Sequence, residues 1–221
     1  MASYDIVTFD CYGTLVDWDE GIGSAFENAA AAAGVEIHRP TLLASWGRIE
    51  PEVQRERYRS YREVLAETAA RVARHLGWEL SLAERDFLAG SLPRWKPFPD
   101  TNAALERLAA EGCRLAVLSN VDDDLFEATR RHFTVAFDWV VTAQQVGAYK
   151  PAEPHFREAR RRIAGARWLH AAQSRFHDVA PARALGIPAA WVNRRNEPAA
   201  GGPAPDFEVP DLASLAALVC G

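Results

Sequence analysis

The sequence predicts an α/β fold in which a parallel sheet carries helices on both faces and an all-helical segment follows the first strand. Three observations support this fold class. Short apolar runs that end at turn-forming or polar residues alternate with helical stretches over most of the chain. Such alternation is typical of a parallel sheet. From about Val16 to Pro97, in contrast, apolar residues recur at helical spacing and no strand is evident.

Five apolar runs and one weaker run are the expected strands. The first, residues 5–9 (DIVTF), ends at Asp10 and is followed by a turn glycine, Gly13. Helices are expected at 101–111 and 178–185, because each apolar helical pattern ends at a glycine. The remaining strands are expected at 115–118, 137–142, 168–172, 189–193 and, more weakly, 207–209.

The helical segment divides into several expected helices. Residues 22–33 are rich in alanine, and Leu42, Trp46, Ile49 and Val53 recur at helical spacing. Further helices are expected at 61–76 and at 81–89, the second with a Ser81–Glu84 capping box. An insertion after the first strand lies over the carboxyl ends of the strands, where open α/β sheets bind ligands. We therefore expect a core domain of residues 1–15 and 98–221 and a helical cap domain of residues 16–97.

Composition excludes several classes of protein. The 221 residues include 25 Lys+Arg and 30 Asp+Glu, and the net charge of −5 argues against nucleic-acid or anionic-membrane binding driven by bulk charge. No apolar run is long enough to span a membrane. The N-terminus lacks the basic region of a signal peptide, so we expect a cytoplasmic protein. The three cysteines are widely spaced and form no zinc or disulfide pattern.

Polar residues follow the expected strands at the points where those strands end. Asp10 and Thr14 follow the first strand, Ser119 and Asn120 follow the second, and Lys150 and Asp178 follow two others. Each has an ordinary structural explanation by itself, such as capping a turn or a helix. Together, at neighbouring strand ends, they place a carboxylate nucleophile beside a lysine that can hold it ionised, with hydroxyl groups that can bind an anion.

These residues also resemble four motifs of the haloacid dehalogenase (HAD) superfamily, in order along the whole chain. The first motif is Asp10 to Asp17 (DCYGTLVD), and the second is Leu118-Ser119-Asn120. Lys150-Pro151 resembles the third motif, and the stretch from Ser174 to Asp178 resembles the fourth. The resemblance implies a Rossmann-like core with a helical cap and a hydrolase in which Asp10 forms a covalent ester that water then hydrolyses.

Two departures from the phosphatases of this superfamily indicate the subfamily. Phosphatases have a second aspartate two residues after the nucleophile, where this chain has Tyr12, and an acidic Mg²⁺ ligand where it has Ala172-Gln173-Ser174. Mg²⁺ prefers six oxygen ligands, so this set favours no metal and no cofactor. The Asp-x-Tyr-Gly-Thr form instead resembles the L-2-haloacid dehalogenases, which need no metal and displace halide from carbon with inversion.

The resemblance to those dehalogenases is incomplete around the substrate. They have serine and asparagine where this chain has Gln173 and Arg175, and tyrosine where it has Phe156. They also have a cap arginine directly after a tryptophan, whereas here Gly47 separates Trp46 from Arg48. The implied catalytic residues are Asp10, Thr14, Ser119, Lys150 and Asp178. The expected substrate-binding residues are Cys11, Tyr12, Trp46, Arg48, Asn120, Gln173, Ser174 and His177, the last also a candidate acid or base.

The sequence leaves three functions open. The favoured one is a metal-independent 2-haloacid dehalogenase that acts on a small anionic substrate. The first alternative is a phosphatase with an atypical Mg²⁺ site, and the second is a binding protein that has lost activity. The retention of Asp10, Lys150 and Asp178 argues against the last of these. The aromatic residues of the cap and the family resemblance suggest a homodimer.

Overall fold

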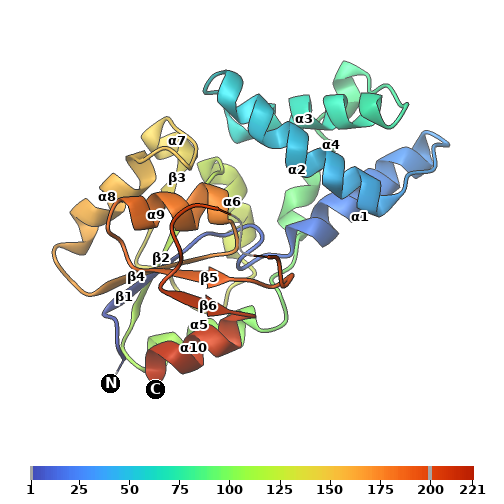
Figure 1. Cartoon of the computed structure of the whole chain (residues 1–221). Coiled ribbons are helices and arrows are strands. Elements are labelled where there is room, and N and C mark those ends of the chain that lie inside the picture. The colour runs from blue at the N-terminus through green and yellow to red at the C-terminus, as the bar shows by residue number, and fades with distance from the viewer. Residues whose placement is uncertain (1, 199–200) are drawn as a thin grey trace. The chain divides into compact units, whose positions relative to one another are not determined.

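The computed structural model describes residues 2–198 and 201–221 and contains a parallel sheet, so the predicted α/β fold is confirmed. The order of its six strands is β3-β2-β1-β4-β5-β6 (Figure 1). β1 therefore lies in the middle of the sheet, and the residues that follow it are flanked by the ends of β2 and β4. The strands are β1 (Ile6–Phe9), β2 (Arg114–Ser119), β3 (Trp139–Thr142), β4 (Trp168–Ala172), β5 (Ala189–Val192) and β6 (Phe207–Val209).

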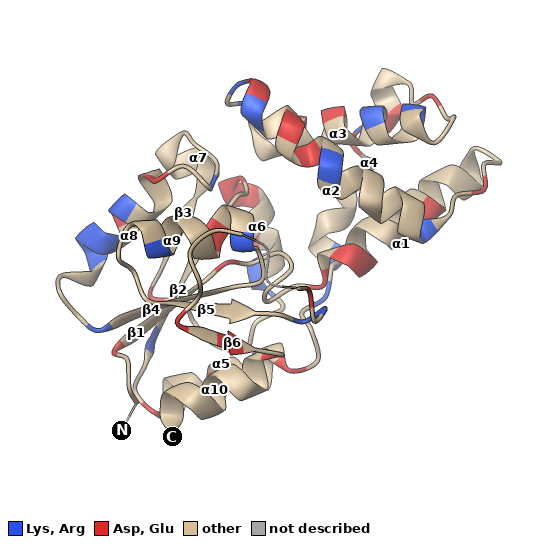
Figure 2. Cartoon of the chain, in the orientation of Figure 1, with Lys and Arg blue, Asp and Glu red and all other residues tan. Residues whose placement is uncertain are grey.

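Helices cover both faces of this sheet. α5 (Thr101–Ala110) and α10 (Leu212–Cys220) pack together on one face, and α10 contains no charged residue (Figure 2). α8 (Pro154–Ile163) packs on β2 and β3 through an apolar stripe, while most of its arginines are exposed. α7 (Ala143–Val146) packs against α8, and a π-helical turn at Arg175–Val179 leads into α9 (Ala180–Ala184).

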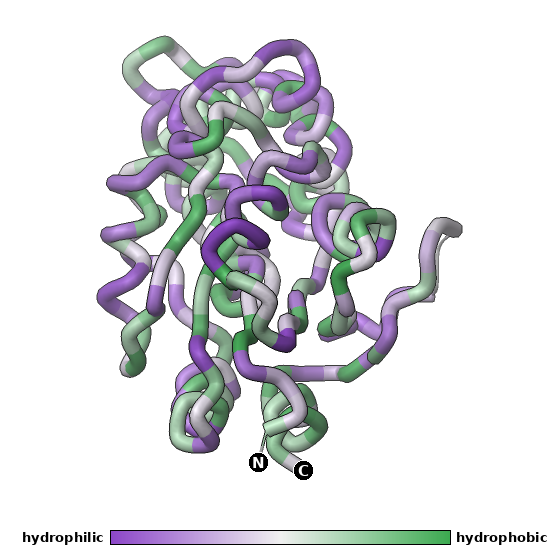
Figure 3. The backbone as a smooth tube through the Cα atoms, turned by 90° about the vertical axis from the view of Figure 1, so that its left-hand side faces the viewer, coloured by the Kyte–Doolittle hydropathy of each residue, from purple (hydrophilic) through white to green (hydrophobic). Residues whose placement is uncertain are grey.

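The two ends of the chain meet on the sheet unit. The backbone N–H of Ser3 donates to the carbonyl of Val219 at 2.9 Å, so the described start of the chain lies beside its C-terminal helix (Figure 3). No helix among residues 2–198 and 201–221 is both long and apolar enough to cross a membrane.

The chain divides by its internal contacts into two compact units. The sheet unit comprises residues 1–17, 97–120 and 131–221, and the helical unit comprises residues 18–96 and 121–130. The domain boundaries expected from the sequence, and the role of the insertion as a cap, stay predictions. The helical unit contains α1 (Trp18–Ala32), α2 (Arg39–Glu56), α3 (Tyr61–His75), α4 (Phe87–Ser91) and α6 (Asp123–Arg130), with 3₁₀ turns at Leu82–Glu84 and Leu92–Arg94.

Aromatic packing and a buried carboxylate organise the helical unit. The Phe26 ring makes edge contacts with Trp46 and Phe87, at centroid distances of 6.1 and 5.0 Å. Asp122, which is 5% exposed, accepts hydrogen bonds from the backbone N–H groups of Tyr61 and Arg62 at 2.8 and 2.9 Å. These donors open α3, so Asp122 supplies acceptors to N–H groups that have no partner within the helix.

Two helix predictions need correction. The single helix expected at 81–89 is wrong, because the Ser81–Glu84 capping interaction starts only one 3₁₀ turn, and α4 begins separately at Phe87. The helix expected at 178–185 begins earlier, with the π-helical turn at Arg175. Asp178 therefore lies within that turn rather than at a helix start.

Candidate active site

A tight turn after β1 shapes the first part of the candidate site. The carbonyl of Cys11 accepts the backbone N–H of Leu15 at 2.7 Å, and Gly13 has φ of +91°, a conformation that favours glycine. The turn brings the Thr14 hydroxyl to Asp10, where it donates to Oδ2 at 2.9 Å. One oxygen of the Asp10 carboxylate is thus oriented by a residue only four positions along the chain.

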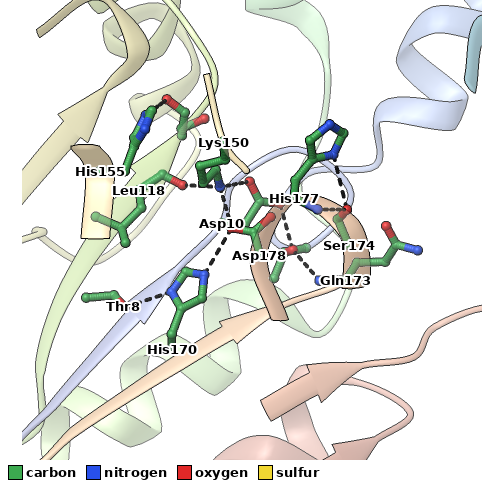
Figure 4. Close-up of polar contacts among 12 residues, drawn as sticks. Thr8, Asp10, Leu118, Lys150, His155, His170, Gln173, Ser174, His177 and Asp178 are labelled. Atoms are coloured by element: carbon green, nitrogen blue, oxygen red, sulfur yellow. Dashed lines mark hydrogen bonds and ion pairs between the residues drawn. The ribbon is translucent and has the colours of Figure 1, made fainter. Parts of the chain in front are cut away.

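Lys150 joins the two carboxylates of the site. Its Nζ donates to Asp10 Oδ1 at 2.9 Å, to Asp178 Oδ1 at 2.5 Å and to the carbonyl of Leu118 at 2.7 Å (Figure 4). Lys150 and Asp178 are both 1% exposed, and Asp10 is 8% exposed. The three ammonium protons therefore have three acceptors, and one positive charge lies between the carboxylates of Asp10 and Asp178 and binds both.

Burial and the neighbouring opposite charges shift the pKa values of these three groups in opposite directions. Burial disfavours the charge of Lys150, but Asp10 and Asp178 outweigh it and raise the pKa of the ammonium. Burial would raise the pKa of Asp178, but Lys150 and a hydrogen bond from His170 lower it to about 2. For Asp10, burial prevails over Lys150 and Thr14, and the negative charge of Asp178 adds to it, so its pKa is raised. Asp10 is the carboxylate of the pair that is held less firmly in its charged form.

Ser119 ends β2 and Asn120 follows it, and their side chains differ in their hydrogen bonds. Both ends of the Asn120 amide bind the backbone of Lys150: Nδ2 donates to its carbonyl at 3.0 Å, and Oδ1 accepts its N–H at 2.7 Å. Asn120 thereby fixes the loop that carries Lys150. The Ser119 hydroxyl is buried and has no hydrogen-bond partner within the described part of the chain. It is therefore available to a ligand.

The segment after β4 adds a third side to the site. The backbone N–H of Gln173 donates to the Thr14 hydroxyl at 2.9 Å, which links this segment to the turn after β1. The Ser174 hydroxyl accepts the backbone N–H of His177 at 3.0 Å and lies 3.2 Å from its Nδ1 (Figure 4). The structure thus brings His177 and Ser174 together as a pair that begins the turn carrying Asp178.

The other predicted binding residues lie in the turn after β1 and in α2. Cys11 is buried, and its burial and the adjacent Asp10 raise the pKa of its thiol well above the usual range, so it stays a thiol. Tyr12 is half-buried in the turn after β1. Trp46 and Arg48 belong to α2 of the helical unit, where Trp46 is buried and Arg48 is exposed. Their role in binding stays a prediction.

Two buried histidines of the sheet unit were not identified from the sequence. His170 lies in β4 and contacts Asp178, and its only sequence signal is a polar residue inside an apolar run. His155 lies in the first turn of α8, and its Nε2 donates to the carbonyl of Ser119 at 3.1 Å. Burial, followed by the charge of Lys150, lowers the pKa of His155 to about 3.

His155 gives the folded protein a specific pH dependence. Its pKa falls from 6.5 to about 3 on folding, so the unfolded chain binds a proton below pH 6.5 that the folded chain does not. The contribution of His155 to the free energy of unfolding should therefore be constant above pH 6.5. Below that pH it should decrease by up to about 1.4 kcal/mol per pH unit. His155→Gln should remove this slope in urea unfolding at pH 7.5, 6 and 5. His75→Gln, at an exposed position, is the control, and equal slopes in wild type and His155→Gln would contradict the expectation.

The donor set does not fit Mg²⁺. Asp10 and Asp178 already share the ammonium of Lys150, and the stretch Ala172-Gln173-Ser174 supplies no further carboxylate. Among the described residues, no group of three or more His, Cys, Asp or Glu side chains is arranged to hold a metal ion.

Comparisons with known proteins identify the family of this chain. The family model of haloacid dehalogenase-like hydrolases matches residues 4–172. An (S)-2-haloacid dehalogenase of Pseudomonas sp. (strain YL) is 29% identical over 96% of this chain and 93% of its own. The (S)-2-haloacid dehalogenase H-109 of Pseudomonas putida is 30% identical over 97% of both chains. The solved structure of L-2-haloacid dehalogenase from Xanthobacter autotrophicus, with chloropropionic acid covalently bound, is 25% identical, covers 99% of each chain and has a TM-score of 0.85.

Proposed function

Because this chain belongs to the haloacid dehalogenase-like hydrolases, we propose that it hydrolyses the carbon–halogen bond of a small 2-halocarboxylate, with Asp10 as the nucleophile. The observation that carries this proposal is the Asp10–Lys150–Asp178 group. Lys150 and Thr14 orient the two oxygens of Asp10, and each oxygen keeps a further lone pair. A positioned carboxylate of this kind is suited to attack an electrophilic carbon.

The first step forms an ester and releases halide. An oxygen of Asp10 attacks C2 of the substrate, the new C–O bond forms, and the halide leaves with the electron pair of the C–X bond. The attack is in line with the leaving group, so C2 is inverted. Halide needs no proton to leave, which suits a site with Tyr12 where the phosphatases of the superfamily have a second aspartate.

The second step hydrolyses the ester. Water attacks the carbonyl carbon of esterified Asp10 and gives a proton to Asp178, whose Oδ2 is buried without a partner among the residues described. The tetrahedral intermediate then expels the 2-hydroxycarboxylate, whose oxygen takes the first water proton back from Asp178, and the second water proton leaves the Asp10 carboxyl group for solvent. Asp10 is regenerated with one oxygen from water, and the net products are the 2-hydroxy acid, halide and a proton.

The substrate carboxylate requires hydrogen-bond donors, because Asp10, Asp178 and Lys150 together carry one net negative charge. The Ser119 hydroxyl, buried and without a partner in the part of the chain described, is the first such donor. Backbone N–H groups of the turn that holds Cys11 and Tyr12 supply others. Asn120 contributes indirectly, by fixing the Lys150 loop. Gln173, Ser174, His177, Trp46 and Arg48 remain candidates for substrate contacts.

The proposal predicts halide release that does not require a metal. With (S)-2-chloropropionate as substrate and EDTA present, the protein should release chloride at the same rate as with added Mg²⁺. Because C2 is inverted, the product should be (R)-lactate. Chloride is followed with an ion-selective electrode, and the lactate is analysed by chiral chromatography.

Two results would contradict this function. One is the absence of halide release from every member of a panel of two- to four-carbon 2-haloacids. The other is Mg²⁺-dependent turnover of p-nitrophenyl phosphate that Asp10→Asn abolishes, which would favour the phosphatase instead.

A further inference from the structure

A chain of hydrogen bonds leads from the interior of the sheet unit to Asp178. The Trp168 indole Nε1 donates to the Thr8 hydroxyl at 2.8 Å, and the same hydroxyl lies 2.8 Å from His170 Nδ1. His170 Nε2 lies 3.0 Å from Asp178 Oδ1 (Figure 4). Thr8 and His170 are paired in the register of β1 and β4, so their side chains share one face of the sheet.

This polar chain crosses a region that is otherwise apolar. Thr8 and His170 are 0% exposed, and the Phe156 ring contacts the His170 ring edge-on at 5.3 Å. Ile6 and Leu118 belong to the apolar cluster on the same side of the sheet. A buried polar group is costly unless every donor and acceptor is matched. The directions of these bonds therefore follow from the groups at the two ends of the chain.

Those end groups fix the tautomer of His170. Indole N–H only donates, so Thr8 accepts from Trp168; a carboxylate only accepts, so His170 Nε2 carries a proton and donates to Asp178. In the neutral form of the ring, which we infer here, Nδ1 is the acceptor and takes the hydroxyl proton of Thr8. Every donor of the chain thus points toward Asp178.

The consequence for Asp178 is that one oxygen carries two donors and the other carries none. Oδ1 accepts from Lys150 Nζ and from His170 Nε2, whereas Oδ2 is buried and has no partner in the described portion of the chain. Two donors from different elements set the position and rotation of the carboxylate. They also stabilise its charge, which agrees with its lowered pKa.

We propose that His170 is a positioning residue that holds Asp178 ionised with Oδ2 free to accept the proton of the hydrolytic water, and that Thr8 and Trp168 fix the ring of His170. The inference deepens the proposed function and rests on it for the role of the water. It assigns His170 to the second step, ester hydrolysis, and not to halide displacement. The ionisable groups near Asp178 and His170 include Lys150, Asp10, His155 and the neighbouring His177, and all are present in each variant below.

The test separates the two chemical steps in His170→Leu and His170→Gln. In His170→Leu, chloride release in the first turnover should stay within about threefold of wild type, while steady-state turnover falls about 100-fold, within the range of general-base effects. The Asp10 ester should then accumulate and appear in intact-protein mass spectra. The acidic limb of the turnover–pH profile should move to higher pH, because the carboxylate loses a donor. His170→Gln, which keeps an N–H donor, should recover most of the loss.

A smaller effect in the same direction is expected for Thr8→Val, which removes the hydroxyl and keeps the shape of the side chain. Thr68→Val is the matched control, because the Thr68 hydroxyl is buried in the helical unit without a partner in the described residues. A purely structural role would lower both chemical steps together and leave the pH profile in place. That outcome, or no recovery in His170→Gln, would overturn the proposal.

One measurement does not depend on the substrate. Two-bond ¹H–¹⁵N spectra of the six histidine rings, with His170 assigned by its loss in His170→Gln, should show Nε2 protonated and Nδ1 unprotonated. An unprotonated Nε2 or a protonated Nδ1 would overturn this assignment of the hydrogen-bond chain even if halide release is observed. If wild type releases no halide but the Nε2–H form is found, the proposed function fails while the assigned hydrogen-bond chain stands.

Discussion

Asp10→Asn should reduce halide release by about 10⁴-fold or more, because an amide oxygen is a weak nucleophile and the ester cannot form. The variant should nevertheless fold. Asparagine keeps an acceptor for Lys150, and Asp178 still balances the ammonium charge. Asp86→Asn, at an exposed position of the helical unit, is the control and should retain wild-type activity.

The same substitution should leave the protein at least as stable as wild type. The pKa of Asp10 is raised in the folded state, so the charged carboxylate at neutral pH weakens folding, and a neutral amide relieves this. Thermal melting at pH 7.5 measures the effect. A lower melting temperature would contradict this stability effect, and chloride release by Asp10→Asn above about 1% of wild type would contradict the role of Asp10 as nucleophile.

Lys150→Met should cause a large loss of stability as well as of activity. It removes the donor shared by Asp10 and Asp178 and leaves two buried carboxylates without a counterion. Breaking a buried ion pair on one side typically costs about 3–5 kcal/mol. Lys96→Met is a matched control, since Lys96 is exposed and is the only other lysine of the chain.

The stability deficit of Lys150→Met should depend on pH in a defined direction. Without the ammonium, the folded-state pKa of both carboxyl groups rises above that of the unfolded chain. The folded variant then takes up protons more readily, so its deficit should be smaller at pH 5 than at pH 7.5. Urea unfolding at the two pH values gives both free energies. A loss below about 1 kcal/mol at pH 7.5 would contradict the structural role of Lys150.

The sequence was sufficient for the sheet and for the convergence of Asp10, Lys150 and Asp178. Both were predictable because apolar runs in the sequence end at polar residues, and parallel strands bring such ends together. The role of His170 could not be predicted, because it depends on a contact with Thr8 across 162 positions and on the β1–β4 register. Asn120 is similar, since only the folded loop shows that its amide binds the backbone of Lys150.

Short helices were less predictable from the sequence than strands. No helix was expected at 123–130, 143–146 or 212–220, where α6, α7 and α10 form. α10 has no charged residues to mark an outer face, and its helix is supported by packing on α5. The segment 81–89 carries a helix-start signal, but that signal starts a 3₁₀ turn instead of a continuous helix.

The carboxylate of Asp122 has a consequence for modularity. Residues 18–96 form one continuous stretch, but their unit also includes 121–130, and Asp122 supplies the acceptors for the first N–H groups of α3. An excised 18–96 fragment would leave those donors to water. Recombination that transplants this helical segment into another scaffold must therefore carry two pieces of chain, or provide a substitute carboxylate at the recipient junction.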